Sequence, residues 1–184
     1  MCSDTELYNR FLSGDKTAYD ELMIRYGDSL TNYLIGYLHN PEDAEDLMID
    51  TFARIMVKRP SIGDGNFKAY LYKVGRNFAT RFHLRKSRAE VFSLDEMETE
   101  PESGENIGEE HLTRERAAVI RRCLNRVEQE YREALWLVYM ENMSYEKAAA
   151  IMKVSYKRMD YMLQKGKQLL RAELSKEGIT EPDD

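Results

Sequence analysis

The stretch from Ser144 to Leu170 is SYEKAAAIMKVSYKRMDYMLQKGKQLL, and it decides the fold of the C-terminal half. Ser144 is the expected N-cap of a short helix rich in small residues, with Glu146 in the first turn where a carboxylate suits the helix dipole. Ser155 offers a second cap. The longer helix that follows repeats apolar or small residues at steps of four, three and four, which predicts one buried face. These residues are Met159, Leu163, Gly166 and Leu170.

The opposite face of this second helix is basic and aromatic. It carries Tyr156, Lys157, Arg158, Tyr161, Gln164 and Lys165. A short helix, a tight turn and a longer helix with such a face are typical of a helix-turn-helix. An ordinary amphipathic hairpin with a solvated charged face has the same pattern, so both interpretations stay open at this point.

The remaining periodic segments also repeat at helical spacing. We expect helices over residues 5–13, 17–38, 42–58, 67–88, 114–127 and 129–141. Within them Met56, Ile120 and Tyr139 are expected to point inward with the other apolar residues. The sequence therefore predicts an all-α protein of two small helical domains, a bundle over residues 1–88 and a four-helix domain over residues 114–184.

The net charge of −6 is strongly segregated along the chain. Residues 67–88 hold seven Lys or Arg and no acid, whereas residues 89–113 hold nine Asp or Glu and no Lys or Arg. The second segment also lacks periodicity, and its low hydrophobicity cannot offset the entropy of ordering, so we expect an acidic flexible linker. Basic blocks on both sides of it suggest a polyanion binder with two sites. Charge blocks that only keep helices soluble are the plainer alternative.

Several other classes of protein find little support in the sequence. Cys2 and Cys123 form no CxxC pair, and no apolar run is long enough to span a membrane, so we expect a cytoplasmic protein. His39, His83 and His111 share no spacing with cysteines or carboxylates, and neither a glycine-rich phosphate loop nor a GxSxG motif occurs. We therefore expect no catalytic residues, no metal, no cofactor and no small-molecule substrate.

Three blocks of the chain resemble the sigma factors of bacterial RNA polymerase, specifically the compact extracytoplasmic-function type. DAEDLMIDTFARI, Asp43 to Ile55, is similar to the family's second-region segment that grips the polymerase clamp. FKAYLYKVGRNFATRFHLRKSR, Phe67 to Arg88, is similar to the segment that melts and reads the minus-ten element. Residues 144–170, together with residues 124–142, resemble the fourth region, which reads the minus-thirty-five element. The three blocks cover most of the chain outside the linker and the termini.

The resemblance implies a polymerase-binding helix, which needs an apolar anchor and an acidic rim. The residues expected to supply them are Asp43, Glu45, Asp46, Leu47, Ile49, Asp50, Phe52 and Ile55. A merely solvated acidic face is the alternative for the carboxylates.

For the minus-ten element the resemblance implies basic residues that follow the backbone and a pocket for a flipped base. Asn77 and the loop from Ile62 to Asn66 are expected to line that pocket. Phe67, Tyr70 and Tyr72 are candidates for stacking on bases, with Phe67 and Tyr70 favoured as core residues. The whole expected set is Ile62, Gly63, Asp64, Gly65, Asn66, Lys68, Lys73, Arg76, Asn77, Arg81, Arg85 and Lys86.

For the minus-thirty-five element the expected contacts are Tyr156, Lys157, Arg158, Asp160, Tyr161, Gln164 and Lys165. Within this block two positions depart from the family pattern. Lys153 stands where the turn commonly has Gly, so a left-handed backbone there carries some strain. Asp160 stands where many members place a base-reading Lys or Arg, and since a carboxylate can accept from the amino group of cytosine, we expect altered specificity.

The resemblance implies a transcription initiation factor, acting on a stress or envelope-response regulon, whose partners are core RNA polymerase (clamp and flap), promoter DNA and an anti-sigma factor. A free-standing helix-turn-helix regulator that binds duplex DNA without polymerase is the alternative function. The block from Asp43 to Ile55 discriminates between them, because a simple repressor has no need of a second helical domain bearing it.

Overall fold

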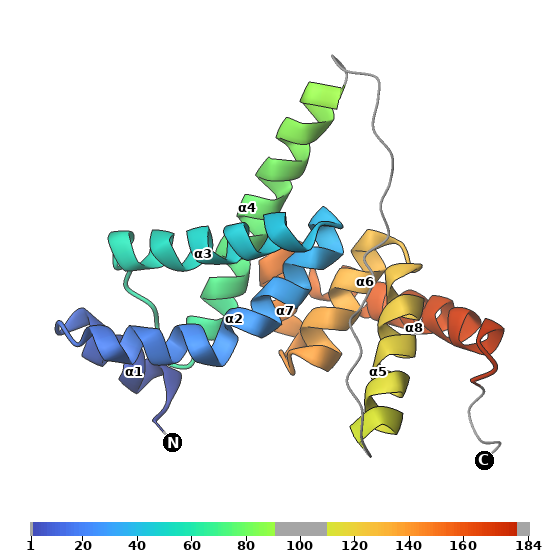
Figure 1. Ribbon diagram of the computed structural model, residues 1–184, viewed down its shortest axis with the longest axis horizontal. Coiled ribbons are helices and arrows are strands. Elements are labelled where there is room, and N and C mark those ends of the chain that lie inside the picture. Colours follow the sequence, from blue (N-terminus) through green and yellow to red (C-terminus); the bar gives the residue numbers. More distant parts are fainter. Residues whose placement is uncertain (1, 91–109, 180–184) are drawn as a thin grey trace. The chain divides into compact units, whose positions relative to one another are not determined.

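The structure is a computed structural model that describes residues 2–90 and 110–179, with side chains described at residues 2–85 and 118–179. Every regular element in these ranges is a helix, which confirms the all-α class, and the helices fall into two units (Figure 1). Unit 1 holds α1 (Asp4–Leu12), α2 (Lys16–Leu38), α3 (Pro41–Lys58) and α4 (Phe67–Glu90). Unit 2 holds α5 (Glu110–Asn125), α6 (Gln129–Leu135), the π-helix η1 (Trp136–Met140), α7 (Tyr145–Met152) and α8 (Tyr156–Lys176).

Side-chain caps set the starts of the first three helices. Ser3 accepts a hydrogen bond from the backbone N–H of Glu6, Asp15 accepts from Thr17 and Ala18, and Asn40 accepts from Glu42 and Asp43. Hydrogen bonds from the Thr17 hydroxyl and the Arg10 guanidinium lower the pKa of Asp15 to about 2, so this cap stays ionised. Each start lies one residue before the predicted one, because the capping oxygen satisfies orphan N–H groups at that point.

The core of unit 1 lies where α2, α3 and α4 meet. Leu22 and Leu34 of α2, Phe52 of α3 and Leu71 of α4 are fully buried or nearly so. The buried aromatic hydroxyl of Tyr72 also finds a partner, since it lies 2.9 Å from the Ser29 hydroxyl. The last turns of α4 extend beyond the other helices of unit 1 (Figure 1).

The core of unit 2 is built on a close contact between α6 and α8. Gly166 of α8 faces Leu135 and Tyr131 of α6 so closely that an added Cβ would lie 3.1 Å from Leu135 Cγ and 3.3 Å from Tyr131 Cβ. Met159 and Leu163 on the same side of α8 are fully buried, as their spacing predicts.

The predicted helix over residues 129–141 is wrong in its second half. From Trp136 the chain forms a π-helix, in which the Glu141 N–H donates to the Trp136 carbonyl at 3.0 Å. The wider turn shifts the phase of the side chains. Tyr139, which was predicted to point inward, is therefore 45 % exposed. A separate error concerns α5, where Ile120 was also predicted to point inward and is 39 % exposed.

The predicted acidic linker overlaps the observed helices at both ends, since α4 continues to Glu90 and α5 begins at Glu110. Its central residues 91–109, on which the prediction of flexibility falls, lie outside the described residues. Over the described ranges, no helix combines the length and the apolar character needed to cross a membrane.

Unit 2 gives a sharp test of the contact between α6 and α8. Replacing Gly166 with Ala adds a methyl group at 3.1 Å from two Leu135 atoms, and this overpacking outweighs the gain in helix propensity. We expect the free energy of unfolding of unit 2 to fall by about 1–2 kcal/mol. The fluorescence of Trp136, the single tryptophan of the chain, reports the urea transition of this unit.

The matched control is Gly27→Ala in α2, where the added Cβ lies 3.9 Å from Met48 in ordinary contact. It should leave the Trp136 transition in place and stabilise unit 1 by up to about 1 kcal/mol, seen by circular dichroism. A Gly166→Ala variant as stable as the parent would contradict the close contact.

Candidate nucleic-acid and protein interfaces

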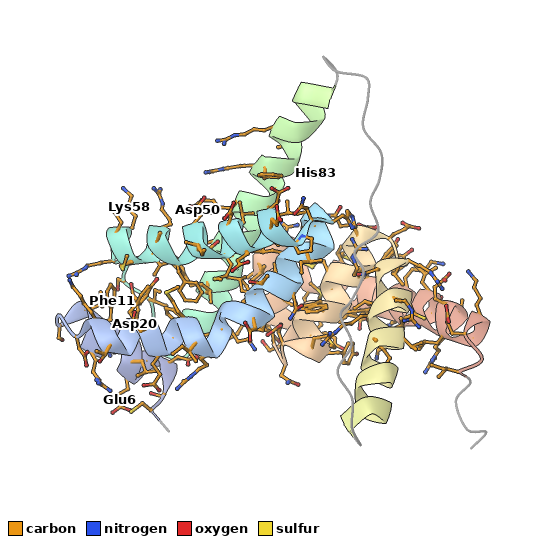
Figure 2. The ribbon with its side chains drawn as sticks, in the orientation of Figure 1. Glu6, Phe11, Asp20, Asp50, Lys58 and His83 are labelled. Carbon is orange, nitrogen blue, oxygen red and sulfur yellow. The ribbon has the colours of Figure 1, made fainter. Side chains whose placement is uncertain are left out.

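Helix α3 has two faces of different character. Its inner face packs into unit 1, whereas its outer face is acidic in the N-terminal half and carries apolar residues beside exposed Arg54 and Lys58 toward the C-terminal end. Figure 2 shows Asp50 and Lys58 pointing away from α2. The outer-face residues that are exposed include Glu42, Glu45, Asp46, Ile49, Asp50, Met56 and Val57.

This division corrects part of the predicted polymerase anchor. Leu47, Phe52 and Ile55 are at most 8 % exposed and pack the core of unit 1, so they offer no surface to a partner. Ile49 is 47 % exposed and keeps its expected place. Asp43 is half-buried at the start of the helix, while the other predicted carboxylates are exposed.

Two residues of the outer face were missed by the sequence analysis. Val57 is 76 % exposed, and Met56, predicted to be inward, is 46 % exposed. Met56 follows Ile49 by seven residues, so the two side chains lie on the same side of the helix. The seven-residue spacing could have indicated that Met56 is exposed like Ile49. It was missed because an apolar residue near the end of an amphipathic helix is usually assigned to the core.

The predicted minus-ten residues lie on the loop between α3 and α4 and along α4. Gly63, Asp64, Gly65 and Asn66 are exposed, and Ile62 is half-buried. Lys68 at the start of α4 sits over two aromatic rings, 5.7 Å from the centroid of Tyr26 and 5.9 Å from that of Tyr72.

Further along α4 the basic residues follow one another on a helix whose other face packs against α2 and α3. Lys73, Arg81 and Arg85 are exposed and Arg76 is half-buried, while the side chain of Lys86 lies outside the described ones. Figure 2 shows His83 on the part of α4 that extends beyond the other helices of unit 1. An extended helix with cations at this spacing can follow a phosphate backbone.

The structure separates Asn77 from the loop with which it was expected to form a pocket. Asn77 is half-buried on α4, eleven residues after Asn66. A helix rises about 1.5 Å per residue, so the two lie roughly 16 Å apart along the axis. They can contact different nucleotides of one strand, but they do not line a single pocket.

Two of the aromatic candidates for base stacking are core residues. Phe67 is 2 % exposed with its ring centroid 5.3 Å from that of Tyr8, as favoured from the sequence. Tyr72 is fully buried and hydrogen-bonded to Ser29, so its expected stacking role is wrong. Tyr70 is half-buried.

In unit 2 the two predicted caps are present. The Ser144 hydroxyl accepts from Lys147 N at 3.3 Å, and the Ser155 hydroxyl accepts from Arg158 N at 3.2 Å. Hydrogen bonds from its own backbone N–H and from the Ser144 hydroxyl lower the pKa of Glu146. Lys153 ends α7 with φ 59° and ψ 41°, the left-handed conformation predicted for this position. The turn between α7 and α8 therefore has the geometry of a helix-turn-helix.

The outer face of α8 presents the predicted set together, because all its members lie within its first ten residues. Tyr156 and Tyr161 are 55 % and 50 % exposed. Lys157, Arg158 and Gln164 are exposed, and Asp160 and Lys165 are half-buried. The N-terminal half of such a helix is the part that reaches base edges in a major groove.

Two pairs of side chains on this face restrict its conformations. Arg158 forms an ion pair with Glu130 of α6 at 2.9 Å and lies over the ring of Tyr161 at 5.3 Å from the centroid. Gln164 Nε2 donates to Asp160 Oδ2 at 2.9 Å. Glu130 was missed, because it lies 28 residues before its partner. Asp160 and the carbonyl of the oriented Gln164 amide offer acceptors, which match the amino groups of cytosine and adenine.

A second aromatic group lies beside this face. Lys167 Nζ stands 4.9 Å from the centroid of the Tyr139 ring, and the rings of Tyr145 and Tyr156 lie 5.8 Å apart. Burial raises the pKa of Tyr139, but hydrogen bonds from Lys167 and Tyr145 outweigh it, so the net shift is downward. Where side chains are described, no group of three or more His, Cys, Asp or Glu is placed to hold a metal ion.

Two family models match the chain, one on each unit. The model of Sigma-70 region 2 matches residues 22–89, and the model of Sigma-70 region 4 matches residues 117–170. The first covers most of unit 1 with α3 and α4, and the second covers the helix-turn-helix.

Individual proteins give the same result. The RNA polymerase sigma-H factor of Pseudomonas aeruginosa is 26 % identical over 161 residues, which span 81 % of this chain and 82 % of that protein. The ECF RNA polymerase sigma factor SigM of Bacillus subtilis is 28 % identical over 153 residues, 83 % of this chain and 93 % of that one. Among solved structures, the sigma factor RpoE of Bartonella quintana in complex with the anti-sigma factor NepR has a similar fold, with a TM-score of 0.64 and 23 % identity over 85 % of this chain and 96 % of that one.

Proposed function

The chain belongs to the sigma-70 family, in its extracytoplasmic-function group, and is an RNA polymerase sigma factor; from this we propose how its surfaces divide the work. The outer face of α3 binds core polymerase. The loop between α3 and α4, together with α4, acts on the opened promoter strand, and α8 reads the upstream duplex. The protein contributes no catalytic step of its own.

The observation that carries this proposal is the two-faced character of α3. A helix buried on one side and exposing Ile49, Met56 and Val57 on the other leaves apolar surface that a partner can cover. The exposed acids of its N-terminal half form a polar rim that favours a basic partner surface. A regulator that acts without polymerase does not need such a face, so the observation favours the sigma-factor interpretation over the alternative.

A substitution on this face should weaken polymerase binding without unfolding unit 1. Val57 and Met56 are exposed, so Val57→Asp and Met56→Asp remove apolar contact at little cost in stability. We expect the affinity for core polymerase to fall at least about tenfold, as for truncated anchors in the centre of an interface. Fluorescence anisotropy with labelled protein measures this affinity.

Ile24→Asp is the matched control, because Ile24 is 83 % exposed but lies on α2. It should bind core polymerase like the parent. If folded Val57→Asp and Met56→Asp variants bind core polymerase with the parental affinity, the outer face of α3 is not part of the interface.

The DNA-binding proposal separates duplex recognition from strand opening. The outer face of α8 carries Lys157, Arg158 and Lys165 on one helix with a helix-turn-helix start, which suits a major groove. The basic run along α4 follows a loop of small polar residues, and exposed cations beside such a loop suit an unpaired strand.

Two substitutions should therefore affect different steps, one the binding of closed duplex DNA and the other the formation of open complexes. Lys165→Ala should weaken binding of the holoenzyme to a closed duplex promoter about tenfold, since a base contact contributes about 1–3 kcal/mol. Asn77→Ala should leave closed binding near normal and reduce open complexes by a similar factor. Duplex gel-shift and permanganate footprinting of unpaired thymines measure the two steps.

Lys176→Ala serves as the control for α8, because Lys176 ends the helix far from its N-terminal half and pairs with Glu173. It should change neither step. The division of labour is wrong if Asn77→Ala opens DNA normally while Lys165→Ala does not.

The pair formed by Asp160 and Gln164 should set base preference. Asp160→Asn keeps the shape of the side chain but removes the charge and makes one end a donor. At the contacted position we expect weaker selection, by about tenfold, of a base that presents an amino group (cytosine or adenine) over guanine or thymine. Binding to DNA of any sequence should become tighter, because the repulsion from phosphate is lost. Selection from randomised duplexes by the holoenzyme measures both effects, and an unchanged preferred sequence would count against the assignment.

An anti-sigma factor is the partner we infer for regulation. The support is the fold shared with Bartonella quintana RpoE, a sigma factor whose structure was determined with the anti-sigma factor NepR. An inhibitor that covers the outer face of α3 would compete directly with polymerase for the same apolar residues.

A further inference from the structure

Helix α1 contacts the loop between α3 and α4 near both of its ends. Figure 1 shows this connecting segment passing α1 on its way from α3 to α4. Three side chains of α1, spaced by three residues, make the contacts: Thr5, Tyr8 and Phe11. Their partners are more than 45 positions away in the sequence, so only the fold brings them together.

The contacts involve both ends of the loop. Thr5 Oγ1 accepts a hydrogen bond from Gly65 N at 2.9 Å near the end of the loop. The Tyr8 hydroxyl donates to the Pro60 carbonyl at 2.8 Å near its beginning. The Arg59 guanidinium, one residue before Pro60, lies 5.1 Å from the centroid of the Phe11 ring.

The loop needs such support, because its sequence does little to order it. Gly63 and Gly65 are both exposed, and Gly65 has a positive φ of 67°. Fixing the backbone of one residue costs about 1–2 kcal/mol of conformational entropy, and glycine has the most freedom to lose. Within the loop itself, the Asn66 N–H donates to the Gly63 carbonyl at 3.1 Å.

Helix α1 is in turn fixed to α2, so it can act as a rigid support. Asp4 forms an ion pair with Arg25 at 2.7 Å and accepts a hydrogen bond from the Tyr26 hydroxyl. Leu7 and Phe11 are buried in the core of unit 1. The support therefore has its own anchors, independent of the loop.

We propose that Thr5 and Tyr8 are positioning residues for promoter opening: they hold residues 60–66 in the conformation that receives an unpaired base. This inference rests on the proposed function, in which the loop acts on the opened strand. The two residues touch the loop rather than the DNA. They determine the fraction of molecules in which the loop has the conformation that binds the base. When this fraction decreases, the apparent affinity for the opened strand decreases in proportion.

The test uses substitutions that each remove a single hydrogen bond between α1 and the loop. Thr5→Val keeps the shape of the side chain and loses the acceptor for Gly65 N, whereas Thr5→Ser keeps the hydroxyl. Tyr8→Phe loses only the donor to Pro60. Because Gly65 is exposed, water replaces its lost partner in Thr5→Val, and the melting temperature of unit 1 in this variant should stay close to that of the parent.

With the full-length protein in the holoenzyme, we expect Thr5→Val to reduce open complexes about two- to tenfold, the factor that corresponds to one hydrogen bond. Tyr8→Phe should act in the same direction, and Thr5→Ser should restore the parental level. Closed duplex binding should not change. Selectivity among the four bases at the position held by the loop should broaden in Thr5→Val, a change that general destabilisation would not produce.

Hydrogen exchange of the Gly65 amide gives a readout that does not depend on promoter opening. The amide should be protected in the parent and in Thr5→Ser, and should exchange faster in Thr5→Val. Asn9→Ala, on an exposed position of α1, is the control and should alter none of these measurements.

A substitution in the loop itself distinguishes a wrong function of the loop from a wrong positioning role of α1. If Asn66→Ala leaves opening unchanged, the loop does not act on the strand and both proposals fall together. If Asn66→Ala impairs opening while Thr5→Val and Tyr8→Phe do not, the positioning role of α1 is wrong and the proposed function of the loop stands. Loss of opening in Thr5→Ser as well as Thr5→Val would also overturn the inference, because the hydroxyl would then be irrelevant.

Discussion

Unit 1 depends on the position of one buried tyrosine, Tyr19. Its ring stands 4.4 Å from the ring of Phe11 on α1 and 5.8 Å, edge-on, from that of Phe52 on α3. Its hydroxyl donates to the Phe52 carbonyl at 2.6 Å, and burial raises its pKa, so it remains a neutral donor. A single side chain of α2 therefore sets the place of α1 and α3 together. The outer face of α3 and the support for the following loop both follow from this contact.

Local patterns predicted the helices, because caps and apolar periods act over three or four residues. Ser144 and Ser155 start α7 and α8 where the sequence places them, and Lys153 has the expected left-handed backbone. Errors arose where a local rule had a competitor. The π-helix after Leu135 turns the side chain of Tyr139 to a different side of the helix. A pattern that assumes 3.6 residues per turn cannot predict this change.

The contacts that matter most for the candidate site could not be predicted from the sequence. Thr5 and Gly65 lie 60 positions apart, and Glu130 and Arg158 lie 28 apart. Each residue is unremarkable in its own segment: a threonine in a first helical turn, and an acid near a helix start. Their partners are determined by packing elsewhere, through Leu7 and Phe11 for α1 and through Gly166 for α8. The family resemblance located the functional segments, but it did not show which side chains hold them in place.

The proposed polymerase face lies on α3, and the loop directly follows this helix, so the two proposed sites are adjacent in the chain. The loop begins at Arg59, the residue directly after α3, where the backbone turns with φ 44°. A partner bound to Met56 and Val57 lies within one helical turn of that point, while α1 holds the loop from the other side at Pro60 and Gly65. A partner that restricts the last turn of α3 also reduces the freedom of the loop that it precedes, so a second ordering event costs less entropy than it would alone. If the two surfaces have the roles proposed above, polymerase binding and capture of an unpaired base would favour each other without any rearrangement of the helices.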